Sequence, residues 1–352
     1  MAGACLDTAV VEIRCARGAR KLPCQRLIEL VGEHHRGPHH RSAFQSGCSG
    51  SGRPVALAGT SPVKLAMIIA TSAACPRPPG AGEHESIPSN PRFDPHVAHP
   101  ARVYNLWLGG KDGYAADREA AEQVARRRPQ VVVGARANRA FLARVVRYLA
   151  AQRGIRQFLD IGTGLPAPGS THEVALAVAP ESRVVYVDKD PQVLSHARAL
   201  LASGPRGACS YVEADMRHPG GVLDQAAQTL DLTRPTAVLL LAILHFIPDA
   251  DDPQGIVARL AAGLGPGSFV AVSHLTADFA PEQVASAVAA YNALVPAEVT
   301  PRNHAEATAL FGGLSLVAPG VVPVAERRPD AGWSAQPADL YAGVVGTGRW
   351  PR

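Results

Sequence analysis

The side chains best placed to do chemistry are three carboxylates and two glycines, which stand at the ends of apolar stretches of the sequence. Asp160 comes just before Gly162 and Gly164. Asp188 ends a second apolar run and Asp215 ends a third. Glycine permits positive φ and lets a ligand lie close to the backbone. Because the carboxyl ends of parallel strands meet at one edge of a sheet, these residues predict the floor of a nucleotide-type pocket.

Two histidines are placed to act at the same pocket. His245 follows the apolar run 237–244, and His274 ends the run 268–274. An imidazole at such a position can serve as a general base. It can equally be a hydrogen-bonded structural histidine. Both interpretations stay open for His245, and we favour the structural one for His274.

The three acids lie close together only if the apolar runs are neighbouring parallel strands. The composition of the runs indicates that they are strands. Runs that are apolar without polar alternation are typical of strands covered on both faces. Helix-like segments at 191–201 and 253–264 lie between some of them. This alternation predicts an α/β fold with a doubly wound, mostly parallel sheet. The five expected strands lie within 158–164, 183–188, 209–215, 237–244 and 268–274.

A helical segment, residues 90–154, precedes the first expected strand. The sequence predicts helices over 116–127 and 134–152. Apolar residues of the second helix recur at helical spacing and predict one buried face. Arg144 and Arg147 are expected on the solvated side of this helix.

The stretch before these helices mixes aromatic residues with a Gly109-Gly110-Lys111-Asp112 run. Adjacent glycines disfavour a plain helix. The run is typical either of a loop that folds over a ligand or of a structural turn. The apolar and aromatic residues of 103–108 favour a small organic substrate.

The composition divides the chain near residue 90. The 352 residues carry a formal net charge of +5, but residues 1–90 hold 10 Lys/Arg and 6 Asp/Glu, against 25 and 24 in the remainder. The larger part is therefore nearly neutral, and no nucleic-acid partner is expected. Five of the six cysteines lie in residues 1–89, with spacings that fit no common zinc module. The oligomeric state is not indicated.

Residues 1–89 are interpreted as a disordered extension, or as the product of a translation start placed too early, with Met67 as the next methionine. The apolar run 65–70 is too short to span a bilayer. It also lies too far along the chain for a signal peptide. We therefore expect a cytoplasmic protein whose Cys209 is a buried, reduced thiol.

Three acids, Asp249, Asp251 and Asp252, resemble a metal cluster. Asp252 stands directly before Pro253, however, which is typical of a helix N-cap with proline at the first helical position. We therefore expect no metal.

Several motifs together resemble one bacterial family over about residues 90–348. They are Ala101-Arg-Val-Tyr104, Leu108-Gly-Gly-Lys-Asp112, Ala116-Asp-Arg-Glu-Ala-Ala121, Ala135-Arg-Ala-Asn-Arg-Ala-Phe141, Gln157-Phe-Leu-Asp-Ile-Gly-Thr-Gly-Leu-Pro166, His172-Glu-Val-Ala175 and Val185-Tyr-Val-Asp188. The family consists of S-adenosyl-methionine-dependent methyltransferases and was long a domain of unknown function. The resemblance implies a class I, Rossmann-like fold of seven strands with an antiparallel last strand, in which 314–317 and 340–345 are the final two. It divides the chain into an extension (1–89), a helical lid segment (90–154) and a methyltransferase core (155–352).

The resemblance also implies S-adenosyl methionine as the cofactor, and the chemistry of each part of this molecule suggests a partner. Asp160 would attract the ammonium group, and the glycine loop would approach the amino acid portion. Asp188 would accept both ribose hydroxyls, since a carboxylate offers two acceptor oxygens. Asp215 would accept from the adenine amino group. The expected cofactor contacts are Asp160, Gly162, Thr163, Gly164, Asp188, Asp215 and Met216.

No motif identifies the methyl acceptor, and we expect a small molecule. His245 would act as the general base, although methyl transfer depends mainly on alignment and can proceed without one. The residues expected in the lid and the acceptor pocket are Arg102, Tyr104, Gly110, Lys111, Asn138 and Arg139.

Two alternative functions fit parts of the sequence. Gly162-x-Gly164-x-x-Ala167, followed by Asp188 about 20 residues on, fits the dinucleotide fingerprint of an NAD(P)-dependent oxidoreductase. Pro166 disfavours this function because the helix of that fingerprint should begin there. Asp160 disfavours it as well, because a carboxylate would repel a pyrophosphate. The second alternative is a sensor that binds S-adenosyl methionine without catalysis.

Overall fold

The computed structural model describes residues 10–15, 18–23, 94–190, 193, 209–329 and 337–348. The chain forms two units, residues 1–85 and 86–352, which are described separately. In the first unit, β1 (Val10–Cys15) pairs antiparallel with β2 (Gly18–Pro23). The other predictions for residues 1–89, and the helix expected over 191–201, lie outside the described residues.

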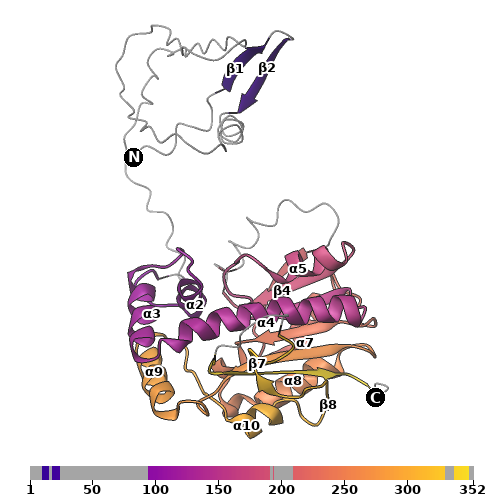
Figure 1. The fold of residues 1–352 in the computed structure, drawn as a ribbon. Helices are drawn as coiled ribbons and strands as arrows, with labels where there is room; N and C mark the ends of the chain where they lie inside the picture. The colour runs from indigo at the N-terminus through magenta and orange to yellow at the C-terminus, as the bar shows by residue number, and fades with distance from the viewer. Residues whose placement is uncertain are drawn as a thin grey trace. The chain divides into compact units, whose positions relative to one another are not determined.

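The second unit is built on one eight-stranded sheet (Figure 1). β10 is antiparallel to each of the strands it pairs with, β7, β8 and β9. The strand order is β5-β4-β3-β6-β7-β10-β8, with β9 paired to β10 off this path. The order reverses between β3 and β6, and ligands of such sheets bind outside the carboxyl ends of the strands at this switch point. The strands are β3 (Gln157–Ile161), β4 (Arg183–Asp188), β5 (Cys209–Glu213), β6 (Ala237–Leu241), β7 (Phe269–Leu275), β8 (Ser315–Leu316), β9 (Val322–Pro323) and β10 (Leu340–Gly346).

The five apolar runs form strands β3 to β7, which confirms the predicted doubly wound sheet. The antiparallel strand near the C-terminus is also confirmed, although β9 adds a short eighth strand. β6 ends at Leu241 rather than at Leu244, because Ala242 adopts a left-handed backbone (φ 54°). The chain then turns into the 3-10 helix η1 (Leu244–Phe246).

Helices cover both faces of the sheet. α3 and α4 match the two predicted N-terminal helices, but α4 begins at Gln130 rather than at residue 134. The α-helices in the described residues are α2 (Pro100–Trp107), α3 (Ala115–Arg127), α4 (Gln130–Gln152), α5 (Thr171–Val178), α7 (Pro219–Ala226), α8 (Pro253–Ala262), α9 (Pro281–Leu294) and α10 (His304–Ala309).

Alternate side chains of each strand enter two separate hydrophobic cores. On one face, Leu159 and Val238 pack with side chains of α7 and α8. On the other face, Phe158 and Leu239 pack with side chains of α4. Because the side-chain period of a strand is two residues, a continuous apolar run supplies both cores at once.

A third apolar cluster joins α2, α3 and α9. Val103, Val124 and Tyr291 contribute to it from these three helices. α3 and α9 are far apart in the sequence but pack side by side (Figure 1). Together the three helices lie at one end of the sheet, and the predicted lid segment supplies two of them (Figure 1).

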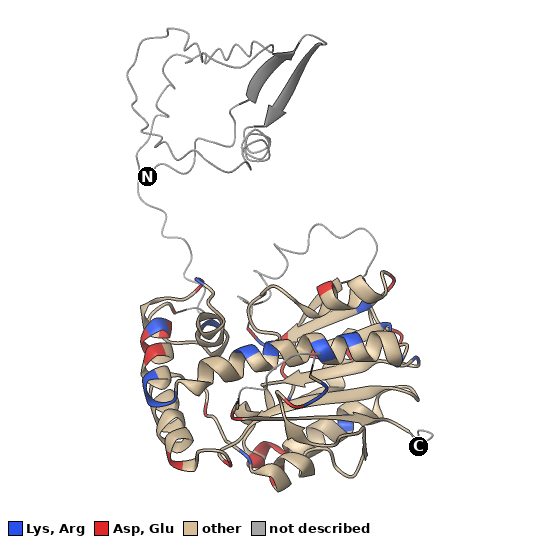
Figure 2. Cartoon of the chain, viewed as in Figure 1, with Lys and Arg blue, Asp and Glu red and all other residues tan. Residues whose placement is uncertain are grey.

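The predicted surface position of Arg144 is wrong. All charged residues of α4 are arginines (Figure 2), and Arg147 is exposed as expected. Arg144, however, is only 6% exposed. Its guanidinium donates hydrogen bonds to the carbonyl oxygens of Val324 (2.8 Å) and Arg327 (3.2 Å). Helical periodicity could not reveal these acceptors because they come from a segment about 180 residues further along the chain.

Two smaller expectations can be compared with the described residues. Cys209 is a free thiol, but it is half-buried rather than fully buried, and desolvation raises its pKa. No helix in the described ranges is long and apolar enough to cross a membrane.

Candidate active site

One large cavity, of about 510 Å³, opens at the carboxyl ends of β3, β4 and β6. Its volume lies in the range of small-molecule sites, roughly 300–1,000 Å³. The glycine loop after β3 forms one part of its wall, and side chains of α2, α3, α4 and α9 form another. The cavity is therefore placed where the strand order predicts a ligand.

The glycine loop depends on backbone conformations that other residues rarely adopt. Gly162 and Gly164 have φ of 75° and 62°. A Cβ atom on Gly162 would lie 2.5 Å from Cγ1 of Ile243, so a side chain there would also collide. The Gly162 N–H donates to the carbonyl of Val187 (2.8 Å), which ties the loop to β4.

Asp160, the last acid of β3 before the loop, is buried at the cavity wall. Thr171 Oγ1 donates a 2.6 Å hydrogen bond to its Oδ2 atom. Desolvation by burial raises the pKa of Asp160 to about 6, against smaller opposing effects of Thr171 and Arg139. Arg139 also donates to the carbonyl oxygen of Ala167 (2.7 Å), so it holds the loop between β3 and α5. This carboxylate is positioned to receive a cation.

Asp188 and the glycine loop are bonded directly to each other. The Gly164 N–H donates to Asp188 Oδ2 (3.1 Å), and the Asp190 N–H donates to Oδ1 (3.0 Å). Burial raises the pKa of Asp188. Each carboxylate oxygen offers two lone-pair sites, so both retain capacity for a ligand hydroxyl.

Asp215 lies after β5 on the same wall, next to Met216. Arg217 approaches Asp215 at 3.1 Å. Desolvation, the largest single effect, raises the pKa of Asp215, but the hydrogen bonds and charge of Arg217 together outweigh it and lower the pKa. Asp215 is thus a partly exposed acceptor, and Met216 is a buried apolar neighbour.

His245 lies in η1, at the end of the cavity wall formed by β6. Its Nδ1 atom is buried and makes no hydrogen bond within the described residues. Desolvation lowers the pKa of His245 well below 6.5, and the nearby His274 and Arg302 lower it further. The imidazole is therefore neutral at pH 7, and the same burial makes it a weaker base than a solvent-exposed histidine.

His274 has both ring nitrogens engaged. Its Nδ1 donates to the carbonyl of Leu275 (2.7 Å), and its Nε2 accepts from Arg302 Nη1 (2.8 Å). Burial lowers its pKa to about 4. These contacts support the structural role favoured from the sequence.

A chain of hydrogen bonds connects the lid to the sheet. Tyr104 of α2 accepts from Asn138 Nδ2 of α4 (3.0 Å) and donates to the carbonyl of Ala135 (3.1 Å). Ser273 Oγ of β7 donates to Asn138 Oδ1 (2.6 Å) and accepts from the Ala242 N–H (2.9 Å). The left-handed turn after β6 is thereby connected to α2.

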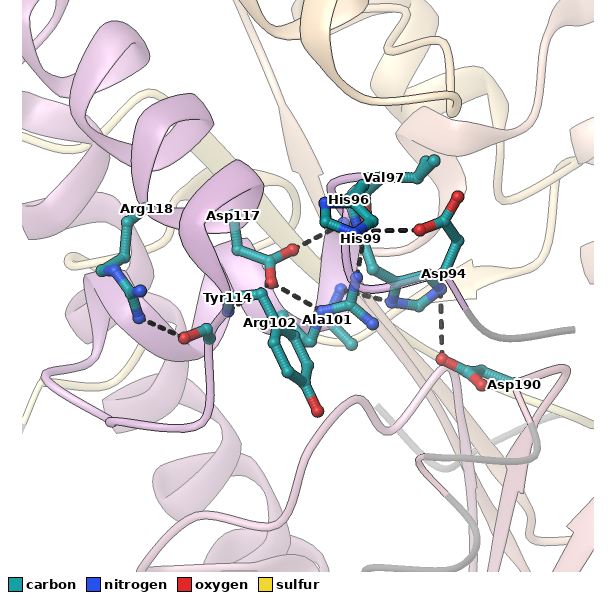
Figure 3. A network of polar contacts seen from close by, with 11 residues as sticks. Asp94, His96, Val97, His99, Ala101, Arg102, Tyr114, Asp117, Arg118 and Asp190 are labelled. Atoms are coloured by element: carbon teal, nitrogen blue, oxygen red, sulfur yellow. Dashed lines mark hydrogen bonds and ion pairs between the residues drawn. The ribbon is translucent and has the colours of Figure 1, made fainter. Parts of the chain in front are cut away.

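Three predicted lid residues lie away from the main cavity. Arg102 forms a buried ion pair with Asp117 (2.7 Å), which also accepts the backbone N–H of Tyr114 (Figure 3). Lys111 lines a second, smaller cavity of about 260 Å³ together with Arg102. Gly110 lines neither described cavity.

His99 lines both cavities and was not singled out from the sequence. Its Nε2 lies 3.2 Å from Asp190, in the loop after β4 (Figure 3). Its Nδ1 accepts from the Ala101 N–H (3.3 Å), so the neutral ring carries its proton on Nε2. Burial is the largest effect on His99 and lowers its pKa. This contact joins the start of α2 to the strand end that carries Asp188.

The main cavity brings together most of the predicted site. The predicted residues that line it are Tyr104, Asn138, Arg139, Asp160, Gly162, Thr163, Gly164, Asp188, Asp215, Met216 and His245. Sequence reasoning missed Phe246 of η1, Val284 and Tyr291 of α9, and Arg128 after α3. The position of Phe246 beside His245 could have indicated it, but nothing in the local sequence connects α9 to the strand ends.

The three clustered acids each have a protein partner. Asp249 pairs with Arg302 (2.6 Å) and Asp251 with Arg217 (2.7 Å). Asp252 caps α8 by accepting from the Gly255 N–H (2.8 Å), which confirms the predicted N-cap. No group of three or more metal-ligating side chains occurs in the described part of the chain.

The loop after β3 does not have the geometry of a dinucleotide fingerprint. In that motif the helix opens directly beneath the pyrophosphate. Here α5 begins at Thr171, well after Gly164, and Asp160 faces the cavity instead. The geometry gives no support to the oxidoreductase alternative.

The chain resembles known methyltransferases in both sequence and fold. A family model described as S-adenosyl methyltransferase matches residues 86–349. The chain is similar to the crystal structure of a DUF574 family protein from Streptomyces avermitilis, with 48% identity over 72% of this chain and 99% of that one, and a TM-score of 0.69. It is similar to a protein from Thermobifida fusca described as a methyltransferase, with 36% identity over 75% of this chain and 100% of that one, and a TM-score of 0.68. No curated protein matched.

Proposed function

Because the chain belongs to the S-adenosyl methyltransferase family, we propose that it methylates a small molecule held in the apolar part of the main cavity. The protein is an S-adenosyl-methionine-dependent methyltransferase. The acceptor and the contribution of each residue are what we propose here.

The described residues fit this cofactor. The left-handed Gly162 and Gly164 bring backbone close to the cavity, where a Cβ would collide or be strained. Asp160 is a buried carboxylate next to this loop, and it forms no ion pair with any described residue. When bound, S-adenosyl methionine supplies a methyl group on a sulfonium and is left as the neutral thioether.

Each acid at the strand ends has a proposed partner in the cofactor. Asp160 attracts the ammonium group, and the loop 162–164 lies along the amino acid portion. Asp188, whose two oxygens are oriented by backbone N–H groups, accepts from the ribose hydroxyls. Asp215 accepts from the adenine amino group, and Met216 packs against the ring.

The acceptor occupies the part of the cavity under the lid. Val124 of α3 and Val284 and Ala287 of α9 line this part. The observation that carries the proposal is that one continuous cavity joins the acidic strand ends to this apolar chamber. A concave apolar site of this size favours a small acceptor over a macromolecule, because such sites bury most of the surface of a small ligand.

His245 is the proposed general base. It is neutral and lines the cavity, and its buried Nδ1 has no hydrogen-bond partner among the described residues. It takes the proton that the acceptor atom loses as that atom bonds to the methyl carbon. Tyr104, Asn138 and Arg139 hold the lid and loop around the aligned reactants, and alignment is the main requirement of methyl transfer.

The cofactor site is tested by calorimetric titration of the full chain with S-adenosyl methionine, S-adenosyl homocysteine and NAD. We expect the first two to bind and NAD not to bind. Asp188→Ala should lose binding, whereas Asp224→Ala, a change at an exposed acid of α7 outside the cavity, should keep it. Binding of NAD alone would mean that the cofactor assignment is wrong.

The acceptor class is tested with methyl-labelled S-adenosyl methionine. The protein is incubated with a small-molecule extract, with protein and with RNA, each in turn. Label should appear in the small-molecule fraction and be lost with Asp188→Ala. Label in protein or RNA would overturn the proposed acceptor class, and binding without any labelled product would favour a sensor.

A further inference from the structure

Three aromatic rings line the acceptor part of the cavity. Trp107 belongs to α2, Phe246 to η1 and Tyr291 to α9. The Tyr291 ring centroid lies 6.4 Å from that of Trp107 and 6.2 Å from that of Phe246, with interplanar angles of 43° and 41°. Such tilted spacings are favourable between aromatic rings. The rings come from segments far apart in the sequence, so the fold assembles them at this cavity.

The polar atoms of these rings are not equivalent. Trp107 Nε1 donates to the carbonyl oxygen of Ala121 (3.2 Å), so this indole offers a ligand only its apolar surface. Tyr291 is 6% exposed and lines the cavity, yet its hydroxyl makes no hydrogen bond to any described residue. The Tyr291 hydroxyl oxygen is not among the fully buried polar atoms that lack a partner, so it is accessible to water or to a ligand.

The Tyr291 hydroxyl remains protonated at all ordinary pH values. Burial raises the pKa of Tyr291 far above its usual value. A phenolic O–H both donates and accepts hydrogen bonds. The neutral hydroxyl can therefore form a hydrogen bond with a neutral polar group of a ligand, and it carries no charge that would attract an ionised group.

The aromatic end of the cavity adjoins the proposed base. The His245 ring centroid lies 4.4 Å from that of Phe246. A flat molecule that packs against Phe246 therefore lies next to the His245 imidazole. The remaining walls at α3 and α9 include the aliphatic residues Val124, Val284 and Val288.

We propose that the methyl acceptor is a hydroxylated aromatic small molecule that packs among Trp107, Phe246 and Tyr291 and hydrogen-bonds to the Tyr291 hydroxyl. The aromatic rings supply tilted ring contacts, which a saturated molecule of the same shape cannot make. The Tyr291 hydroxyl selects for a ligand that carries a polar group at this position. This inference rests on the proposed function and names the substrate class of the same site.

The test uses the full chain saturated with S-adenosyl homocysteine, titrated calorimetrically with 2-naphthol and with decahydro-2-naphthol. The two probes share a skeleton and a hydroxyl, but only the first is aromatic. We expect 2-naphthol to bind at least about threefold more tightly, the lower part of the range for an aromatic pair. Equal binding of the two probes, or no binding of 2-naphthol, overturns the proposal.

The hydrogen bond is tested with Tyr291→Phe, which keeps the ring and removes only the hydroxyl. It should weaken 2-naphthol binding about three- to tenfold, as expected for one neutral hydrogen bond. The matched control is Tyr211→Phe, because Tyr211 lies on β5 outside the cavity and its hydroxyl also makes no hydrogen bond to a described residue. Unchanged binding in Tyr291→Phe overturns the assignment.

The two proposals fail in different ways. S-adenosyl homocysteine is titrated first with every variant. If it does not bind the wild-type protein, the proposed function fails, and this inference fails with it. If it binds and 2-naphthol shows no preference, only the aromatic acceptor is wrong.

Discussion

At the scale of single residues, the unusual group is Asp160, a buried carboxylate that forms no ion pair with a described residue. Its pKa of about 6 means that the folded protein binds this proton more tightly than the unfolded chain does. The contribution of Asp160 to stability therefore declines as the pH rises from about 4 to about 6, and the full destabilisation is present above that range. The ammonium group of a bound ligand would offset this destabilisation by pairing with the ionised carboxylate.

We predict that Asp160→Asn stabilises the ligand-free protein at pH 8 and weakens its binding of S-adenosyl methionine. The pKa difference corresponds to at most about 3 kcal/mol in the free energy of unfolding, and the neutral amide can still accept from Thr171. Thermal unfolding and calorimetric titration of the same samples measure both effects. A variant that loses stability and keeps its affinity would contradict the assignment.

For the wild-type protein, the affinity for S-adenosyl methionine should fall as the pH drops below about 6, because protonated Asp160 no longer attracts an ammonium group. The slope should approach tenfold per pH unit at lower pH. Asp160→Asn serves as the control, since its affinity should be flat over the same range. A flat wild-type profile would exclude the proposed contact.

His245 leads to a different pH prediction. Its pKa lies well below 6.5, so kcat at saturating S-adenosyl methionine should show no inflection near pH 6.5 and should decline only at lower pH. His245→Ala should reduce kcat by about 10²- to 10⁴-fold, the usual contribution of a general base. Its affinity for S-adenosyl homocysteine should stay unchanged. Equal kcat in the variant would show that alignment alone is sufficient.

At the scale of elements, α2 is held to the core through His99. Its Nε2–H donates toward Asp190, two residues after the proposed ribose ligand Asp188. The groups that face this ring are Asp190, Arg102, Asp117 and Lys189. The His99–Asp190 contact joins two segments that are distant in the sequence. It therefore forms only when α2 packs against the end of β4 in the folded protein.

We predict that His99→Ala increases the dissociation rate of S-adenosyl homocysteine about three- to tenfold, since one partly exposed hydrogen bond is lost. Stopped-flow displacement measures this rate. His96→Ala is the matched control, because His96 is exposed on the same segment. Similar rates in both variants would mean that His99 does not hold the lid.

At the scale of the whole molecule, the core fold was predictable and the lid was only partly so. The acids at 160, 188 and 215 could be placed together because strand ends of a parallel sheet converge. Arg144 could not be placed, because its partners are backbone carbonyls of Val324 and Arg327, which no periodicity indicates. Tyr291 was missed for the same reason, since its role depends on the packing of α9 against α3.

Ligand binding should stabilise the molecule as a whole. S-adenosyl homocysteine at a hundred times its Kd should raise the free energy of unfolding by about 2.7 kcal/mol. We therefore expect an increase in Tm with S-adenosyl homocysteine and none with NAD, measured by differential scanning calorimetry. The Tm of the Asp188→Ala variant should not increase with either ligand. An increase in Tm with NAD would contradict the assignment of S-adenosyl methionine as the cofactor.

The place of β10 has a consequence for synthesis of the protein. β10 pairs with β7 along seven positions and lies in the interior of the sheet, although it comes last among the strands. Until β10 has emerged from the ribosome, β7 has an open, apolar edge, and open edges of this kind favour pairing with other chains. A nascent chain therefore exposes this edge until β10 has left the ribosome and paired with β7, and any pause in that interval lengthens the time during which β7 can pair with another chain.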